Sequence, residues 1–276
     1  MYSSPSEIAD LTVNIGIKKA GLTPLKQFTL GILAGAFIAF GSQAANMATH
    51  TITDAALAKL ISGLIFPAGL MLVLMAGAEL FTGNCLMIAA LAERKITLMK
   101  LLRSWVIVYF GNLAGGVIAA YLIAWSGQLD YTGGLLGGIT IKAAAGKTAL
   151  TFTRAFVLGI LCNWLVCLAV WTSFGAKDGI SKAVCVFFPI WVFIASGFEH
   201  SVANMYYIPA GILAKSNPLY VSKALEAGAS QAGIDALNWC SMFTRNLLPV
   251  TLGNIVGGSV FVGIAYWFIY LRRSKS

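Results

Sequence analysis

Six long apolar runs constrain what this chain can fold into. They cover roughly residues 28–48, 60–92, 105–125, 155–174, 183–213 and 247–270. A helix that crosses the hydrocarbon core of a bilayer needs about 20 mostly apolar residues, so each run is long enough to cross. Only 11% of the 276 residues are charged and the mean hydropathy is +0.82, unlike a water-soluble domain. We therefore expect an all-α polytopic membrane protein with six transmembrane segments.

Composition argues against several other classes. The low charge excludes disorder and a coiled coil, and five cysteines scattered through apolar runs exclude a disulfide scaffold. The net charge of +9 would suggest nucleic acid in a soluble protein. Here we assign it to basic loops that contact anionic membrane lipid, and we expect no nucleic-acid partner. Because no metal-ligand spacing, nucleotide motif or convincing nucleophilic triad is found, we expect no enzyme, cofactor or metal.

The distribution of Lys and Arg predicts the orientation. With the N-terminus in the cytoplasm, twelve of these residues face inside and seven face outside. The clearest inside clusters are Arg94–Arg103 and the C-terminal tail at 271–276. The first apolar run has the length of a span and no cleavage-type tail. We therefore expect insertion into the inner membrane of a prokaryote with both termini cytoplasmic.

The N-terminal segment, residues 1–27, has a different pattern. Ser4-Pro5-Ser6-Glu7 has the form of a capping box with proline at the first helical position. Apolar residues then recur on one helix face: Ile8, Leu11, Ile15 and Leu22. The preferred interpretation is an amphipathic helix lying on the membrane surface. The alternative is that this helix covers the cytoplasmic mouth of a pore and gates it.

Three short strings recur in the same order along the chain. The pairs are Leu30-Gly-Ile-Leu33 with Leu158-Gly-Ile-Leu161, Glu79-x4-Asn84 with Glu199-x4-Asn204, and Gly111-Asn-Leu-Ala-Gly-Gly116 with Gly253-Asn-Ile-Val-Gly-Gly258. They indicate a first repeat at 28–125 and a second at 151–270, joined by an external loop at 126–150. Each repeat has three segments, an odd number, so the second crosses the membrane inverted relative to the first.

Two segments are too long to cross as single helices. Residues 60–92 would extend about 50 Å as one helix, so we expect a break around Glu79–Asn84. Residues 183–213 are expected to break at Gly197–Asn204. Non-helical backbone survives at membrane depth only inside protein or along a cavity, and half-helix N-termini suit an anion. The sequence therefore predicts a small polar site between the second and fifth segments.

Four residues at these breaks are assigned structural roles: Glu79, Asn84, Glu199 and Asn204. An acid facing an anion pore would repel the anion. We therefore expect both glutamates to hold the broken ends by accepting backbone N–H bonds.

Four strings identify a resemblance that covers the chain from about Pro24 to Tyr270. They are Glu79-Leu-Phe-Thr-Gly-Asn84, Cys162-Asn-Trp-Leu-Val-Cys167, Ala195-Ser-Gly-Phe-Glu-His-Ser-Val-Ala-Asn-Met205 and Asn246-Leu-Leu-Pro-Val-Thr-Leu-Gly-Asn254. They are similar to the signature strings of the formate/nitrite transporter family. The resemblance implies an aquaporin-like six-helix protomer, a homopentamer with one pore per protomer, and passage of formate, nitrite or hydrosulfide.

The resemblance also implies which residues line the pore. Thr82 and His200 would face each other midway. The cytoplasmic constriction would consist of Leu70, Leu80 and Phe81, and the outer one of Phe66, Val166 and Phe193. Lys147 and Asn163 would attract and orient the anion. Asn84 stands where the nitrite branch usually has His, so hydrosulfide is placed first and formate next.

His200 suggests a mechanism. A bare anion loses its hydration in an apolar constriction at a cost of several kcal/mol, whereas a protonated weak acid loses far less. We expect His200 to donate a proton or a strong hydrogen bond, so that the anion crosses largely neutralised. The alternative is an aquaporin-like pore for neutral solutes, which the absence of paired Asn-Pro-Ala boxes disfavours.

Overall fold

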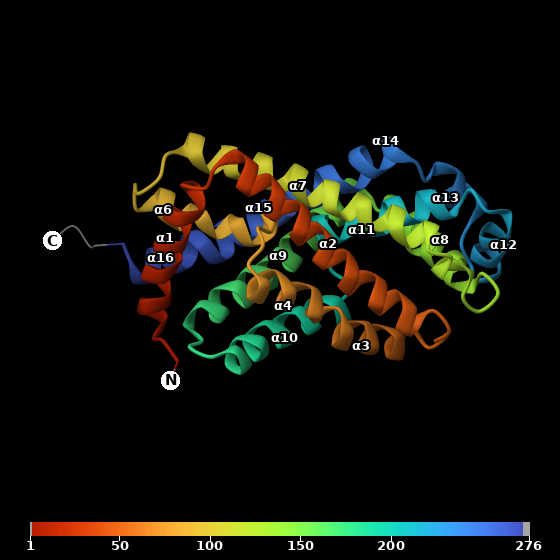
Figure 1. Ribbon diagram of the computed structural model, residues 1–276, viewed down its shortest axis with the longest axis horizontal. Helices are drawn as coiled ribbons and strands as arrows, with labels where there is room; N and C mark the ends of the chain where they lie inside the picture. The colour runs from red at the N-terminus through yellow and green to blue at the C-terminus, as the bar shows by residue number, and fades with distance from the viewer. Residues whose placement is uncertain (1, 273–276) are drawn as a thin grey trace.

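The computed structural model describes residues 2–272, which form an elongated helical bundle without a β-strand (Figure 1). Residues 273–276 of the expected tail lie outside this description. Three expected segments are single long helices: α2 (Pro24–Thr49), α7 (Leu98–Trp125) and α9 (Phe152–Gly175). Each follows a threonine whose side chain caps a backbone N–H of the first turn. Both chain ends lie at one end of the bundle, here named the terminal end; the opposite end is the distal end.

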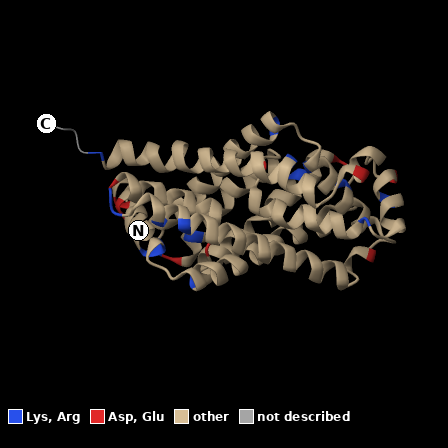
Figure 2. Cartoon of the chain, turned by 90° about the horizontal axis from the view of Figure 1, so that it is seen from above, with Lys and Arg blue, Asp and Glu red and all other residues tan. Residues whose placement is uncertain are grey.

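The distribution of charge and hydropathy matches a protein that crosses a membrane repeatedly. Charged residues lie mostly toward the two ends of the bundle (Figure 2). Five stretches are long and apolar enough to span: Pro24–Thr49, Ala55–Ala76, Leu98–Trp125, Phe152–Gly175 and Trp239–Tyr270. Two shorter apolar helices, Phe81–Ala92 and Gly179–Ala195, belong to the second and fifth segments. The six-segment, all-helical prediction is therefore confirmed.

The second segment is interrupted as the sequence predicted. Its first part is α3 (Ala55–Ile65) followed by α4 (Pro67–Ala76). Helix α4 stops at Gly77, which has a left-handed φ of 83° that a side chain would disfavour. The chain then runs extended to Leu80 and resumes as α5 (Phe81–Asn84), η1 (Cys85–Met87) and α6 (Ile88–Ala92). The break is thus at 77–80, slightly before the predicted position, and Thr82 and Asn84 belong to the first turn after it.

The fifth segment breaks in the same way. Helix α10 (Gly179–Ala195) ends before Gly197, whose φ is 70°, and α11 (Ser201–Ala214) begins after His200. Asn204, expected inside the break, lies in the first turn of α11. Both helix breaks therefore combine a left-handed glycine, an extended stretch and a new helix N-terminus.

The sixth segment is one continuous but irregular helix. It consists of α14 (Trp239–Ser241), η3 (Met242–Leu247), α15 (Leu248–Gly258), η4 (Ser259–Ile264) and α16 (Ala265–Tyr270), where η3 and η4 are turns of π-helix. The first wide turn comes directly before Pro249, which has no N–H and whose ring would clash with a carbonyl of a regular helix.

Glycines set the closest helix contacts in each repeat. A Cβ on Gly35 of α2 would lie 2.1 Å from Asn112 O of α7, and one on Gly253 of α15 would lie 2.1 Å from Phe156 O of α9. These approaches are closer than any side chain allows, so both glycines serve contacts between helices of one chain. The paired contacts α2–α7 and α9–α15 are equivalent in the two inverted repeats.

Helix α1 (Pro5–Ala20) packs on the terminal end of the bundle. The capping box is present: Glu7 N–H donates to Ser4 Oγ, and Ser4 N–H donates to the Glu7 carboxylate at 2.7 Å. The buried face differs from the expected one, because Leu11 is exposed whereas Ile8 and Val13 are buried. Since this face contacts α6, η1 and α9, α1 is part of the protein's packing and not only a surface helix.

The distal end contains helices that the sequence pattern did not reveal. The predicted loop at 126–150 contains η2 (Gln128–Asp130) and the 14-residue helix α8 (Leu135–Thr148). Residues after α11 form α12 (Pro218–Glu226) and α13 (Gln231–Ala236), which pack on α8. Glycines 137 and 138 allow this packing, because a Cβ at either would lie within 3 Å of α12 atoms. The loop prediction was therefore wrong for most of this stretch.

Candidate functional site

One asparagine of α7 satisfies the backbone at the first helix break. The N–H of Glu79 donates to Leu30 O at 3.2 Å. Asn112 Oδ1 accepts the N–H of Phe81 at 2.9 Å, and Asn112 Nδ2 donates to the carbonyls of Gly31 and Glu79 at 2.8 and 2.9 Å. Unpaired backbone groups would cost several kcal/mol at membrane depth, so Asn112 makes this break possible.

Asn254 of α15 does the same at the second helix break. Glu199 N–H donates to Leu158 O at 3.3 Å. Asn254 Oδ1 accepts the N–H of Ser201 at 2.9 Å, and its Nδ2 donates to the carbonyls of Gly159 and Glu199 at 2.8 and 3.0 Å. The inverted repeat therefore extends to individual hydrogen bonds.

The Glu79 side chain faces the terminal end and is bound by two side chains. Its carboxylate accepts from Lys19 Nζ at 2.8 Å and from Asn84 Nδ2 at 2.7 Å. Lys19 also donates to Asn84 Oδ1 at 2.8 Å, closing a three-residue ring. The expectation that Glu79 accepts backbone N–H bonds was wrong, because Asn112 already fills that role.

Glu199 occupies the equivalent position toward the distal end. Its carboxylate accepts from Lys147 Nζ at 2.9 Å, Asn204 Nδ2 at 2.6 Å and Asn246 Nδ2 at 3.3 Å. Glu199 therefore also pairs with side chains and not with the backbone. The distal group differs from the terminal ring in two ways: Asn246 joins it, and Lys147 does not reach Asn204, whose buried Oδ1 has no partner among the described residues.

His200 and Thr82 meet between the two breaks. His200 Nε2 lies 2.8 Å from Thr82 Oγ1, and His200 Nδ1 accepts the N–H of Ala203 at 3.2 Å. Because Nδ1 accepts, the ring proton is on Nε2 and the imidazole is neutral in this arrangement. Both side chains are buried, and they bring the new N-termini of α5 and α11 together.

Apolar side chains lie on both sides of this polar pair. Toward the distal side, the rings of Phe66 and Phe193 meet edge to face at 5.5 Å, and the Phe193 ring is 6.0 Å from the His200 ring. On the terminal side, Leu70 and Leu80 line a small cavity together with Lys19. Val166 of α9 is buried in the same apolar cluster as these four residues.

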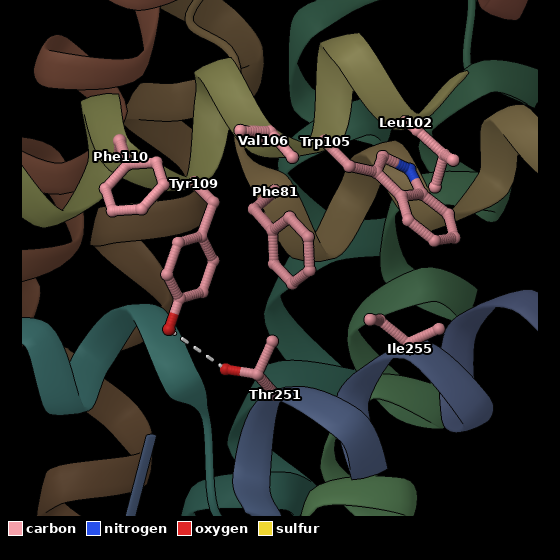
Figure 3. A pocket seen from close by; sticks show the side chains of 8 residues that line it. All are labelled: Phe81, Leu102, Trp105, Val106, Tyr109, Phe110, Thr251 and Ile255. Carbon is pink, nitrogen blue, oxygen red and sulfur yellow. Dashed lines mark hydrogen bonds between the residues drawn. The ribbon is translucent and has the colours of Figure 1, made fainter. Parts of the chain in front are cut away.

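Phe81 points elsewhere than expected. Its ring packs edge to face on Tyr109 at 5.1 Å and on Trp105 at 6.2 Å. It lines a groove of about 350 Å³ with mostly apolar walls. Figure 3 shows the ring beside the hydrogen bond between Tyr109 and Thr251. The cavity that holds Leu70 and Leu80 is lined by Val170 and not by Phe81. Phe81 follows Leu80, which has an extended backbone, and this directs the Phe81 ring toward α7.

Asn163 is engaged by the protein itself. Its Nδ2 donates to Thr82 O at 3.2 Å and to Asn254 O at 2.7 Å. Cys167 Sγ also donates to Thr82 O, at 3.2 Å. With both amide hydrogens used, Asn163 positions Thr82 and has no N–H left for an anion.

Sequence comparison decides the family. The sequence profile described as "Formate/nitrite transporter" matches residues 6–268. The chain belongs to the formate/nitrite transporter family. A probable formate transporter of Methanothermobacter thermautotrophicus is 40% identical over 99% of this chain and 98% of that protein. Formate channel FocA of Escherichia coli (strain K12) is 39% identical over 98% and 95%.

Solved structures of the formate/nitrite transporter family have the same fold. A pentameric formate channel with formate bound superimposes with a TM-score of 0.78, at 37% identity, over 90% of this chain and 98% of that one. An ion channel of the family gives 0.79 at 30% identity, over 95% and 98%. Family membership makes this chain a transport protein and not an enzyme. Three of these four relatives are named for formate and none for hydrosulfide, so the placement of hydrosulfide before formate stays a prediction without support from them.

Sequence reasoning gave no role to Lys19, to Asn246 or to the equivalent pair of asparagines, Asn112 and Asn254. The two asparagines stand in the repeated Gly-Asn strings, which carried a signal for an equivalent role that we did not use. Lys19 has no such signal, because its partner Glu79 is 60 residues away and α1 belongs to neither repeat.

Proposed function

We propose that this chain is a channel for formate and other small monovalent anions of weak acids. It works in the inner membrane of a prokaryote as a homopentamer, with the terminal end in the cytoplasm. Relatives named formate channels at about 40% identity support the cargo, and the pentameric relative supports the assembly. Hydrosulfide and nitrite are further candidate cargoes.

The buried pair of His200 and Thr82 is the observation that carries this proposal. An ion that leaves water for an apolar passage loses its solvation, and hydrogen-bond donors fixed at the narrowest point offset part of that loss. The Phe66–Phe193 contact and the Leu70–Leu80 pair flank these donors and exclude water. The site therefore favours a solute that is small, carries hydrogen-bond acceptors and is easily neutralised.

The hydrogen bonds of His200 suggest how it acts. Its Nδ1 is bound to a backbone N–H, so a cationic ring would first have to break that bond. The neutral ring keeps its Nε2–H, which Thr82 accepts in the absence of cargo. An anion that replaces Thr82 as the acceptor receives a strong hydrogen bond without a fixed positive charge that would trap it.

Reconstituted flux tests this proposal. Proteoliposomes are loaded and assayed for formate, nitrite and hydrosulfide from about pH 5 to 8, with water and glycerol as neutral solutes. We expect formate passage to exceed glycerol passage. His200→Asn should lower formate flux and change the ratio between anions across this pH range, Thr82→Val should lower formate flux, and Thr82→Ser should retain most of it. Equal flux of His200→Asn and the parent at every pH would exclude a role for the imidazole, and glycerol flux above formate flux would favour the neutral-solute pore.

A further inference from the structure

The two cavities that flank the site differ, although the triads behind them are related by the inverted repeat. The terminal cavity measures about 40 Å³ and contains one lysine, Lys19, which is bound to both Glu79 and Asn84. The distal cavity measures about 200 Å³ and is lined by two lysines, Lys59 and Lys147. Only one carboxylate, that of Glu199, lines it.

Lys59 belongs to α3 and has no acidic partner. Among residues 2–272, no carboxylate lies within 4 Å of its ammonium, and no hydrogen bond is made by it. Its Nζ lies against the second helix break, because a Cβ on Gly197 would be 3.5 Å away. The break itself thus leaves room for this ammonium, and a side chain at 197 would crowd it.

Lys147 also keeps capacity to donate. Of its three N–H groups, one is used by Glu199, and the Nζ lies 5.3 Å from the centre of the Tyr207 ring. Lys19, its counterpart, donates to two acceptors. Two lysines and one glutamate give the distal cavity a net charge of +1, whereas the Lys19–Glu79 pair gives the terminal side zero.

We propose that Lys59 and Lys147 form a binding site for one small monovalent anion, a carboxylate of formate size, in the distal cavity. The site neutralises the cavity's surplus charge and holds the anion outside the Phe66–Phe193 contact before it reaches His200. Lys59 is the residue that makes the two ends of the pathway unequal. The choice of a carboxylate as the ligand rests on the proposed function. The surplus positive charge of the cavity is an observation that is independent of that function.

Chemical footprinting tests the site without any flux. The intact protein in proteoliposomes is acetylated with a water-soluble succinimidyl ester, and modification at each lysine is followed by mass spectrometry. We expect sodium formate to slow the acetylation of Lys59, compared with sodium lactobionate at equal ionic strength, since this disaccharide acid is larger than the cavity of about 200 Å³. Lys142, which is exposed at the distal end but outside the cavity, should react equally in both salts.

Flux of matched variants supplies the second measurement. Removing one charge close to a bound anion in a wet site weakens its binding about fivefold. Lys59→Gln should therefore lower formate permeability at low concentration about fivefold, Lys59→Arg should keep most of it, and Lys142→Gln should not change it. Because passive passage obeys detailed balance, the loss must be the same for influx and efflux.

The outcomes separate this proposal from the proposed function. If the parent protein passes formate while Lys59 acetylation is insensitive to formate and Lys59→Gln is unchanged, the anion site is wrong and the channel stands. If the parent passes no formate, the channel proposal fails, and protection of Lys59 by formate still decides whether the site exists.

Discussion

Asn112 and Asn254 make the same three hydrogen bonds in the two halves of the chain, although 142 residues separate them. Each amide bridges the extended stretch of a broken helix, the first N–H of the new helix and a carbonyl of a neighbouring helix. The two breaks are therefore fixed by packing against an intact helix and not by local sequence alone.

This relationship predicts a large effect of removing either amide. Asn254→Leu leaves the buried N–H of Ser201 and the carbonyl of Glu199 without partners, at about 1–3 kcal/mol each, whereas the Gly159 carbonyl keeps its helical bond in α9. We expect a loss of at least about 2 kcal/mol of stability, measured as a lowered thermal midpoint of the purified protein. Asn14→Leu on the exposed face of α1 is the control and should be near neutral. An Asn254→Leu protein with the same thermal midpoint as the parent would show that water replaces the hydrogen bonds of the amide.

The close helix contacts predict a contrast between two glycines. A Cβ on Gly35 would meet a backbone carbonyl at 2.1 Å, so Gly35→Ala must separate α2 from α7. We expect it to destabilise the protein by at least about 2 kcal/mol. Gly146 in α8 has nothing within 4 Å, and Gly146→Ala should stabilise by about 0.5–1 kcal/mol. Both changes in stability are measured by thermal unfolding. A Gly35→Ala protein with the same midpoint as the parent would contradict the close approach of α2 and α7.

The Lys19 ion pair predicts how α1 is attached. Lys19→Ala removes two hydrogen bonds to the first helix break, whereas Lys18→Ala changes an exposed side chain on the same turn. We expect faster hydrogen exchange over residues 5–20 in Lys19→Ala only. Deleting residues 1–22 should change flux without preventing insertion. Unchanged exchange in Lys19→Ala would mean that the apolar face of α1 alone holds it, and unchanged flux in the deletion would exclude gating.

The capping box of α1 predicts a pH dependence outside the membrane. Hydrogen bonds from the Ser4 backbone N–H and hydroxyl lower the pKa of Glu7. A carboxylate with a lowered folded pKa stabilises above its unfolded pKa of about 4.3, and this stabilisation is lost as pH falls through the folded pKa. Protection of residues 4–8 from exchange, corrected for the intrinsic rate, should therefore fall below about pH 4. Glu7→Ala should lack this step; a step of the same size in Glu7→Ala would assign it to another group.

Much of this architecture could be predicted from the sequence. Segment lengths gave six spans, and the excess length of residues 60–92 predicted a break that lies within a few residues of the expected one. The repeated strings predicted the inverted duplication. The direction of Phe81 could not be predicted, because one extended residue before α5 sets the rotation of the new helix and turns the ring toward Trp105 and Tyr109. The distal helix α8 was missed because its glycines at 137 and 138, which we interpreted as loop residues, are the points at which it contacts α12.

The sequence by itself determined that the chain crosses a membrane, that its halves are inverted copies and that two helices are interrupted. These follow from hydropathy, segment length and an odd number of spans, which are properties of the chain read in order. Only the tertiary structure decided that Lys19 and Lys147 bind the two buried glutamates and that Lys59 has no acidic partner among residues 2–272. Such pairings join residues 52 to 60 positions apart, and helix packing, which no local pattern encodes, brings them within hydrogen-bond distance.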